Sequence, residues 1–134
     1  MHATPFLTFP PGGSWGAADA MNAYVDLFGG HIVTDRRRGA DEPGEEGSVL
    51  MAEFVVAGQR FRCSDSAVAH EWTFTPAVSV WVDCASREEQ QHVFTTLARE
   101  GKQHMPLDDY GFGPFGWVED RFGVNWQLAV TEKG

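Results

Sequence analysis

The chain contains few cysteines, since only Cys63 and Cys84 occur among its 134 residues. The two do not form a Cys-x-x-Cys pair, and this pattern indicates neither a disulfide scaffold nor a zinc site. Both lie beside apolar runs that are typical of strands. We therefore expect two buried, unpaired thiols.

Long apolar runs are also missing. No run approaches the roughly 20 residues that a membrane-spanning helix needs. The first residues, MHATPFLTF, lack the basic and apolar segments of a signal peptide. These absences predict a cytoplasmic protein that makes no contact with a membrane.

Basic residues are scarce, because 10 Lys and Arg oppose 19 Asp and Glu, giving a net charge of −9. An acidic surface repels phosphate backbones, so we expect no nucleic acid partner. It repels an anionic membrane surface for the same reason. A neutral or cationic small ligand is compatible with this charge, although solubility alone also explains it.

Large rings, by contrast, are plentiful, with five Trp and ten Phe. Each aromatic side chain can bury roughly 150–250 Å². The rings can therefore supply a dense core or line an apolar pocket. The length and the 43% hydrophobic content are those of one ordinary globular domain.

Periodicity and turn residues divide the first half of the chain into a strand, a helix and three strands. Ser14 is a candidate N-cap of the helix, and Gly29-Gly30 ends it. Ala57-Gly58 joins the last two strands tightly. The strands are predicted at residues 4–9, 31–35, 48–56 and 59–65, with a charged loop at 36–47.

The second half repeats this order after a connector. Ser86 opens the second helix, with Glu89 in a capping-box position, and Gly101 ends it. Asp120 and Gly123 supply the turn of a final hairpin. The strands are predicted at 77–84, at 102–109 and within 116–130, with a glycine-rich link at 110–116.

The two halves also match in residues, which indicates a duplication. TPFLTF at 4–9 matches TPAVSV at 75–80, and the paired residues Gly58 and Phe61 match Gly123 and Trp126. We expect one domain over 1–134 that is built from a first module at 1–66 and a second module at 74–134.

Three segments carry a family resemblance: FGWVEDRFGVNWQL at 115–128, TPFLTF followed by AADAMNAYVDLFGG, and SVLMAEFVVAGQRF. Together they resemble the PhnB-like branch of the vicinal oxygen chelate superfamily, which includes glyoxalases, extradiol dioxygenases and bleomycin-resistance proteins. The resemblance covers nearly the whole chain. It implies an α+β fold in which two tandem βαβββ modules form a half-open curved sheet around a cavity, and it implies a homodimer.

The branch is often labelled a demethylubiquinone methyltransferase. The sequence gives that activity no support. It has no glycine-rich loop between a strand and a helix of the kind that holds a methyl donor, and it is too short for a doubly wound domain.

The resemblance also implies four metal-ligand positions, which relatives fill with His, Glu or Gln in the first and last strand of each module. In this chain Gln127 is the one possible ligand. The other positions hold Arg62, Ala77 and Thr4, or Phe6 if the register shifts by two. Arginine has no lone pair to offer and stays protonated. We therefore expect no family-type metal and no cofactor.

Strand alternation then predicts what lines the cavity. Residues that share a face with the ligand positions should point inward with them. The alternative is that the rings fill the barrel and leave no pocket. The predicted lining residues are Phe6, Thr8, Arg62, Ser79, Trp81 and Gln127.

Acid–base groups are not obvious in this lining. Glu53 and Glu119 lie near the middle of third strands. Either could be a base if it were buried, but both are expected to face outward into solvent. Asp108, Asp109 and Tyr110 lie at a strand end near the expected cavity mouth, where turn chemistry explains them equally well. No histidine falls at a ligand position, and His104 is expected to have an ordinary polar role. We assign no catalytic residue.

Two classes of function follow. The first is a protein that binds a small aromatic or cationic molecule without a metal. The second is a lyase, isomerase or dioxygenase with a divergent metal site. The missing ligands favour the first, and whether the chain is an enzyme stays open because a fold does not determine a function.

Overall fold

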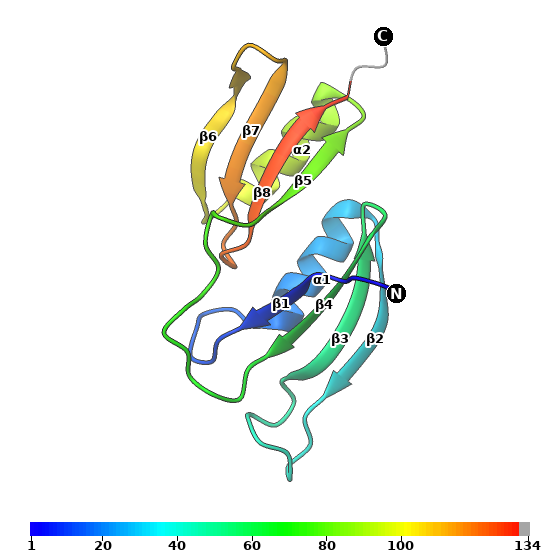
Figure 1. Ribbon diagram of the computed structural model, residues 1–134, viewed down its shortest axis with the longest axis vertical. Coiled ribbons are helices and arrows are strands. Elements are labelled where there is room, and N and C mark those ends of the chain that lie inside the picture. The colour runs from blue at the N-terminus through cyan, green and yellow to red at the C-terminus, as the bar shows by residue number, and fades with distance from the viewer. Residues whose placement is uncertain (132–134) are drawn as a thin grey trace. The chain divides into compact units, whose positions relative to one another are not determined.

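The computed structural model describes residues 1–131. The chain forms two compact units, of which the first spans Met1–Thr73 and the second begins at Phe74. Each unit has the order β-α-β-β-β (Figure 1), which confirms the α+β class and the tandem modules. The first unit contains β1 (Phe6–Phe9), α1 (Ala17–Phe28), β2 (His31–Arg37), β3 (Val49–Val56) and β4 (Gln59–Asp65). The second contains β5 (Ser79–Cys84), α2 (Arg87–Ala98), β6 (Lys102–Asp109), β7 (Pro114–Glu119) and β8 (Asn125–Val130).

The two sheets have the same topology. Their strand orders are β1-β4-β3-β2 and β5-β8-β7-β6. The first strand of each unit pairs in parallel with the last one, and the remaining pairs are antiparallel. One helix lies against one face of each sheet (Figure 1). We call the opposite face of each sheet its open face.

The core of each unit lies between the helix and the sheet. In the first unit Tyr24 of α1 contacts Phe54, whose ring stacks on Phe61 at 5.4 Å between centroids. In the second unit Gly116 of β7 gives room to Phe94 of α2, because a Cβ there would lie 2.6 Å from that ring. Since strand side chains alternate, burial of these residues places their neighbours on the open face.

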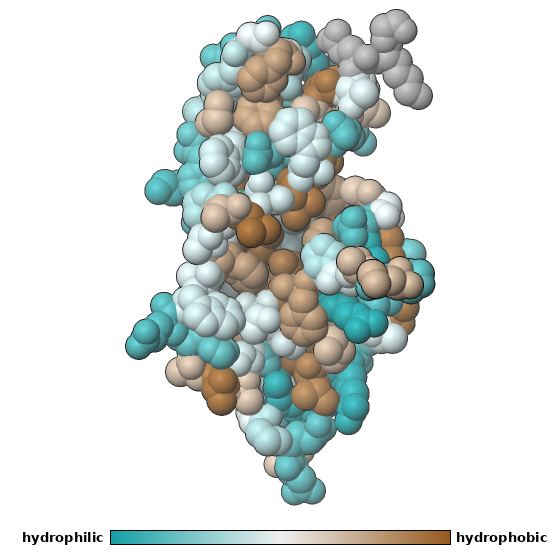
Figure 2. All heavy atoms as spheres, viewed as in Figure 1, coloured by the Kyte–Doolittle hydropathy of each residue, from teal (hydrophilic) through white to brown (hydrophobic). Residues whose placement is uncertain are grey.

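Some apolar side chains remain at the surface. Figure 2 shows brown, hydrophobic atoms among the teal, hydrophilic ones on the viewed face of the molecule. Ile32 and Val33 belong to the edge strand β2, in which all seven residues are exposed. Both cysteines are buried and free, as predicted. None of the helices in residues 1–131 has the length and apolarity needed to cross a bilayer.

Helix α1 begins differently from the prediction. Its N-cap is Gly16, not Ser14. The Gly16 amide donates to Asp19 Oδ2 at 2.9 Å, and the Ala17 amide donates to Asp65 Oδ1 at 2.8 Å. Ser14 is not the cap because another side chain accepts a hydrogen bond from the first turn of the helix. This side chain is Asp65, which lies at the end of β4 and is distant in sequence.

Helix α2 begins as predicted. Ser86 is its N-cap, and the Ser86 hydroxyl accepts from the Glu89 amide at 3.1 Å. Glu89 reaches back to the Ala85 amide at 2.6 Å, one residue before the cap. A local capping motif therefore determines this end, in contrast to α1.

The first strand of each unit is shorter than predicted. They start at Phe6 and Ser79, so Thr4 precedes the strand and Ala77 lies in a turn. Pairing makes Phe6 the neighbour of Arg62 and Trp81 the neighbour of Gln127. Trp81, not Ala77, is thus the equivalent of Phe6. The Thr-Pro dipeptides at 4–5 and 75–76 are alike in sequence, but they do not occupy equivalent positions in the two sheets. Pro114–Gly116 also belong to β7 and not to the glycine-rich link.

Candidate functional site

A row of four side chains crosses each open face, with one residue from each strand. Residues directly opposite each other in paired strands point to the same face, so the strand register defines both rows. The first row is Phe6, Arg62, Glu53 and Thr34. The second row is Trp81, Gln127, Trp117 and Met105.

The first row is charged. Arg62 Nε donates to Glu53 Oε1 at 3.0 Å, and Arg60 Nε lies 3.7 Å from Glu53 Oε2. We call Glu53, Arg60 and Arg62 the Glu53 cluster. Glu53 is only 8% exposed, so the expectation of an outward, solvated carboxylate was wrong. Two arginines of the neighbouring strand enclose it and compensate its burial.

The second row is neutral and has hydrogen-bonded neighbours. Gln127 Nε2 donates to the Ser79 hydroxyl at 2.7 Å. His104 Nε2 lies 2.8 Å from Asn125 Oδ1, and the His104 ring packs on Trp117 with centroids 5.1 Å apart. These side chains offer amide, hydroxyl and imidazole groups that could orient a bound molecule. A register irregularity between Gln103 and Met105 moves His104 relative to simple strand alternation, and alternation alone therefore could not place it.

Rings gather beside the second row. Trp81, Tyr110 and Phe112 each contact Phe115, with centroid distances of 5.6, 6.2 and 5.3 Å. We call these four residues the aromatic cluster. Phe115 is buried, whereas Trp81, Tyr110 and Phe112 are 52%, 40% and 66% exposed. Only Trp81 was predicted as a lining residue, and Tyr110 was expected near the cavity mouth. Phe112 and Phe115 were assigned to the glycine-rich link.

The six predicted lining residues fall into two sets. Phe6 and Thr8 share the open face of the first unit with Arg62, and Ser79 and Trp81 share that of the second unit with Gln127. Arg62 is engaged by Glu53, and Gln127 by Ser79. Their role in ligand binding stays a prediction.

Neither row has the donors that a divalent metal needs. In residues 1–131, no three His, Cys, Asp or Glu side chains are grouped so as to hold an ion. Among the row residues only Glu53 carries a carboxylate and only Gln127 carries a side-chain amide oxygen. Guanidinium groups face the carboxylate of Glu53, and Gln127 is a neutral amide. This donor set does not fit a site of the superfamily type.

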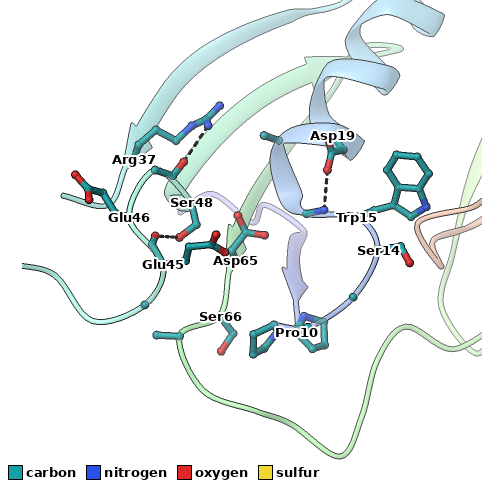
Figure 3. Close-up of a pocket in the computed structure, with 18 residues that line it drawn as sticks. Pro10, Ser14, Trp15, Asp19, Arg37, Glu45, Glu46, Ser48, Asp65 and Ser66 are labelled. Carbon is teal, nitrogen blue, oxygen red and sulfur yellow. Dashed lines mark hydrogen bonds between the residues drawn. The ribbon is translucent and has the colours of Figure 1, made fainter. Parts of the chain in front are cut away.

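A separate cavity of about 440 Å³ lies at the start of α1 (Figure 3). Several of its polar groups are used by the fold itself. Asp65 bonds the amides of Ala17 and Val49, at 2.8 and 2.9 Å, and the Ser48 hydroxyl donates to the Glu45 carbonyl at 2.6 Å. Figure 3 shows Asp65 between the start of α1 and the loop that carries Glu45 and Ser48. We interpret this cavity as the space around a capping arrangement.

The remaining acidic candidates have structural roles. Asp109 Oδ1 accepts from the amides of Gly111 and Gly113, which confirms the predicted turn chemistry. Asp120 Oδ1 accepts from the amides of Phe122 and Val124 in the final hairpin. These carboxylates hold loops in place. Glu119 lies opposite Asn125, and Asp83 is two residues from Trp81, so both share the open face of the second unit with His104.

Comparison with known proteins places this geometry in a family. The chain is 44% identical to the PhnB protein from Bacillus cereus, covering 98% of this chain and 100% of that one with a TM-score of 0.91. It is 26% identical to protein PA1353 from Pseudomonas aeruginosa, covering 97% of each chain with a TM-score of 0.82. A glyoxylase/bleomycin resistance protein/dioxygenase domain from Frankia sp. shares the fold, at 12% identity over all of this chain and 93% of that one and a TM-score of 0.63.

No curated protein matches the chain. A family model described as 3-demethylubiquinone-9 3-methyltransferase matches residues 1–129. The matched segment includes both modules and the final hairpin. The chain therefore belongs to this family, the PhnB-like family that the sequence resembles.

Proposed function

We propose that this protein binds a small molecule on the open faces of its sheets without using a metal. The aromatic cluster of the second unit carries this proposal. Its exposed rings, Trp81, Tyr110 and Phe112, converge on the buried ring of Phe115. Contiguous exposed rings are unusual on a surface without a binding role, and they suit a flat, apolar ligand.

Polar groups beside the cluster support a ligand site. Ser79 and Gln127 share one hydrogen bond, and His104 and Asn125 share another. An apolar wall with a few fixed polar groups is the usual composition of a small-molecule site. Within the proposal the predicted lining residues keep their roles, with Phe6, Thr8 and Arg62 acting in the first unit.

The family description names a methyl transfer, which we do not adopt for this chain. Each described unit contains one four-stranded sheet, in which only one pair of strands is parallel. Dinucleotide- and nucleoside-type cofactors are typically held by a doubly wound parallel sheet with a glycine-rich turn. The alternative of a metal-dependent lyase, isomerase or dioxygenase is disfavoured by Arg62 and by the two aromatic residues, Phe6 and Trp81, at the first-strand positions.

A cytoplasmic homodimer belongs to the same proposal. The resemblance implies a dimer, and the exposed apolar side chains Ile32 and Val33 on the edge strand β2 are compatible with a partner there. Light scattering coupled to size-exclusion chromatography should give twice the chain mass. A mass equal to one chain over a wide range of protein concentrations would contradict this part.

A ligand screen by thermal shift tests the binding function. A compound that binds only the folded protein must raise its melting temperature. We expect hits among planar aromatic compounds, and we expect Trp81→Ala to abolish the shift. Trp72→Ala is the matched control, because Trp72 is also exposed, at 53%, but lies in the connector. The proposal fails if no compound stabilises the wild type, or if Trp81→Ala responds like the control.

A further inference from the structure

The Glu53 cluster presents two guanidinium groups on the open face of the first unit. The side chains of Arg60 and Arg62 are 59% and 52% exposed, whereas that of Glu53 is only 11% exposed. A buried carboxylate thus anchors two arginines whose outer ends reach solvent. The cluster carries two positive charges and one negative charge, so a net positive charge remains on a protein with a net charge of −9.

The geometry leaves the terminal nitrogens of both arginines unused. Each arginine approaches Glu53 with its Nε, at 3.0 Å for Arg62 and 3.7 Å for Arg60. Within residues 1–131, no hydrogen bond to another side chain is formed by either guanidinium. A guanidinium has five N–H donors, so most donors of the pair stay available. Because one carboxylate holds both groups, less side-chain entropy is lost when they bind an anion.

Apolar side chains flank the cluster. Phe6 is the cross-strand neighbour of Arg62 and is 44% exposed. Met51 is two residues from Glu53 in β3, so it lies on the same face, and it too is exposed. A ligand that meets these residues together would combine an anionic group with an apolar body.

We propose that Arg60 and Arg62 bind the carboxylate of a small apolar acid whose body packs on Phe6. The planar arginine fork matches the two oxygens of a carboxylate, and charge-assisted hydrogen bonds of this kind are strong. The charge of the whole protein predicts a neutral or cationic ligand, but the local charge decides at contact distance because salt screens distant charges. This inference rests on the proposed function, since it names the ligand class for one of the two open faces.

A pair of matched probes tests the ligand class. Phenylacetate and phenylacetamide have nearly the same shape and differ in charge. In NMR titrations of the ¹⁵N-labelled full chain, we expect phenylacetate to bind about tenfold more tightly, as one charge-assisted contact can supply. The Nε–Hε signals of Arg60 and Arg62 should move with phenylacetate. Inorganic phosphate should compete only weakly, because it lacks the apolar body.

Three variants of the cluster and one control variant locate the effect. Arg62→Gln and Arg60→Gln should each remove most of the preference for phenylacetate, and Arg62→Lys should restore only part of it because lysine keeps the charge without the fork. Arg87→Gln, which removes an exposed charge on α2, should change nothing. If Arg62→Gln fails to fold, Arg60→Gln carries the test, since Glu53 then keeps its closer partner.

The outcomes separate the two proposals. If both probes bind equally, or if Arg87→Gln has the same effect as Arg62→Gln, the carboxylate site is wrong while small-molecule binding stands. If phosphate binds as well as phenylacetate, the cluster is a general anion site and the proposed ligand class is wrong. If neither probe binds and the aromatic screen is also negative, both proposals fail.

Discussion

Asp65 joins three segments of the first unit through one carboxylate. Oδ1 accepts from the Ala17 amide at the start of α1, and Oδ2 accepts from the Val49 amide at the start of β3. The residue itself ends β4. Because both oxygens are used, the side chain fixes where the helix begins relative to two strands.

Removing this carboxylate should destabilise the first unit. Asp65→Ala leaves two amides without their acceptor, and we expect a loss of about 1–3 kcal/mol in the free energy of unfolding. Asp65→Asn keeps one acceptor oxygen and should cost less. Urea denaturation measures both. Asp41→Ala, in the exposed loop after β2, is the control, and an equal effect of Asp41→Ala and Asp65→Ala would contradict the role of Asp65.

The buried thiols should be inert in the native protein. Burial, aided by the charge of Asp65, raises the pKa of Cys63 to about 12, and burial raises the pKa of Cys84 to about 11. The ordinary value is 9.0. A thiol reagent at about pH 8 should therefore label neither cysteine until denaturant is added, because the thiolate is the reactive form.

Because folding raises the pKa of both thiols, the free energy of unfolding should fall at alkaline pH. The stability that arises from keeping the thiols neutral is complete below about pH 9 and is lost as pH rises towards 11 and 12. Alkaline unfolding should begin in this window. Rapid labelling of the folded protein at neutral pH would show that the thiols are accessible and reactive, and would contradict this expectation.

At the scale of elements, a tight glycine contact recurs in both units. Gly30 precedes β2 and Gly101 precedes β6. A Cβ on Gly30 would collide with the carbonyl oxygen of Val55, and one on Gly101 with that of Glu119. In each unit the edge strand can thus start close to the third strand only because this residue has no side chain.

Adding a methyl group here should disturb the pairing of β6 with β7. Gly101→Ala forces the backbones apart, and overpacking of this kind costs about 1–3 kcal/mol. Gly13→Ala is the matched control, since its Cβ would have its nearest neighbour at 3.7 Å. Thermal denaturation and amide exchange in β6 and β7 measure the effect. Gly101→Ala with unchanged stability would show that the strands can adjust freely.

At the scale of the whole molecule, two modules share a topology and differ in chemistry. Their helix-facing sides remain apolar, with Phe54 and Phe61 in one and Val118 and Trp126 in the other. On the open faces, the equivalent positions hold Arg62 in one unit and Gln127 in the other. Because folding depends mainly on the buried side, the open faces could diverge without loss of the fold.

This divergence predicts weak metal binding. After incubation of the untagged protein with Mn²⁺, Ni²⁺ or Zn²⁺ and removal of free ions, we expect well below one equivalent per chain. A positively charged Arg62 and a neutral Gln127 cannot compensate the dehydration of a divalent ion. One retained equivalent that is lost in Gln127→Ala would overturn this expectation and restore the enzymatic alternative.

Local sequence signals predicted much of this fold. Strands β4 and β6 have the predicted bounds, Ser86 caps α2, and Gly29 ends α1 in a left-handed conformation. Each of these features depends on residues within one turn or one strand. Ser14 as a cap was wrong, because its competitor Asp65 is distant in sequence.

The sequence by itself determined the duplication, the order of the elements and the family, because hydrophobic periodicity and turn residues act over short distances. Only the tertiary structure decided which residues meet on the open faces. Strand register made Phe6 and Trp81 equivalent, buried Glu53 between two arginines, and gathered the rings around Phe115. Register depends on pairing between distant strands, and a shift of one residue moves every side chain to the other face.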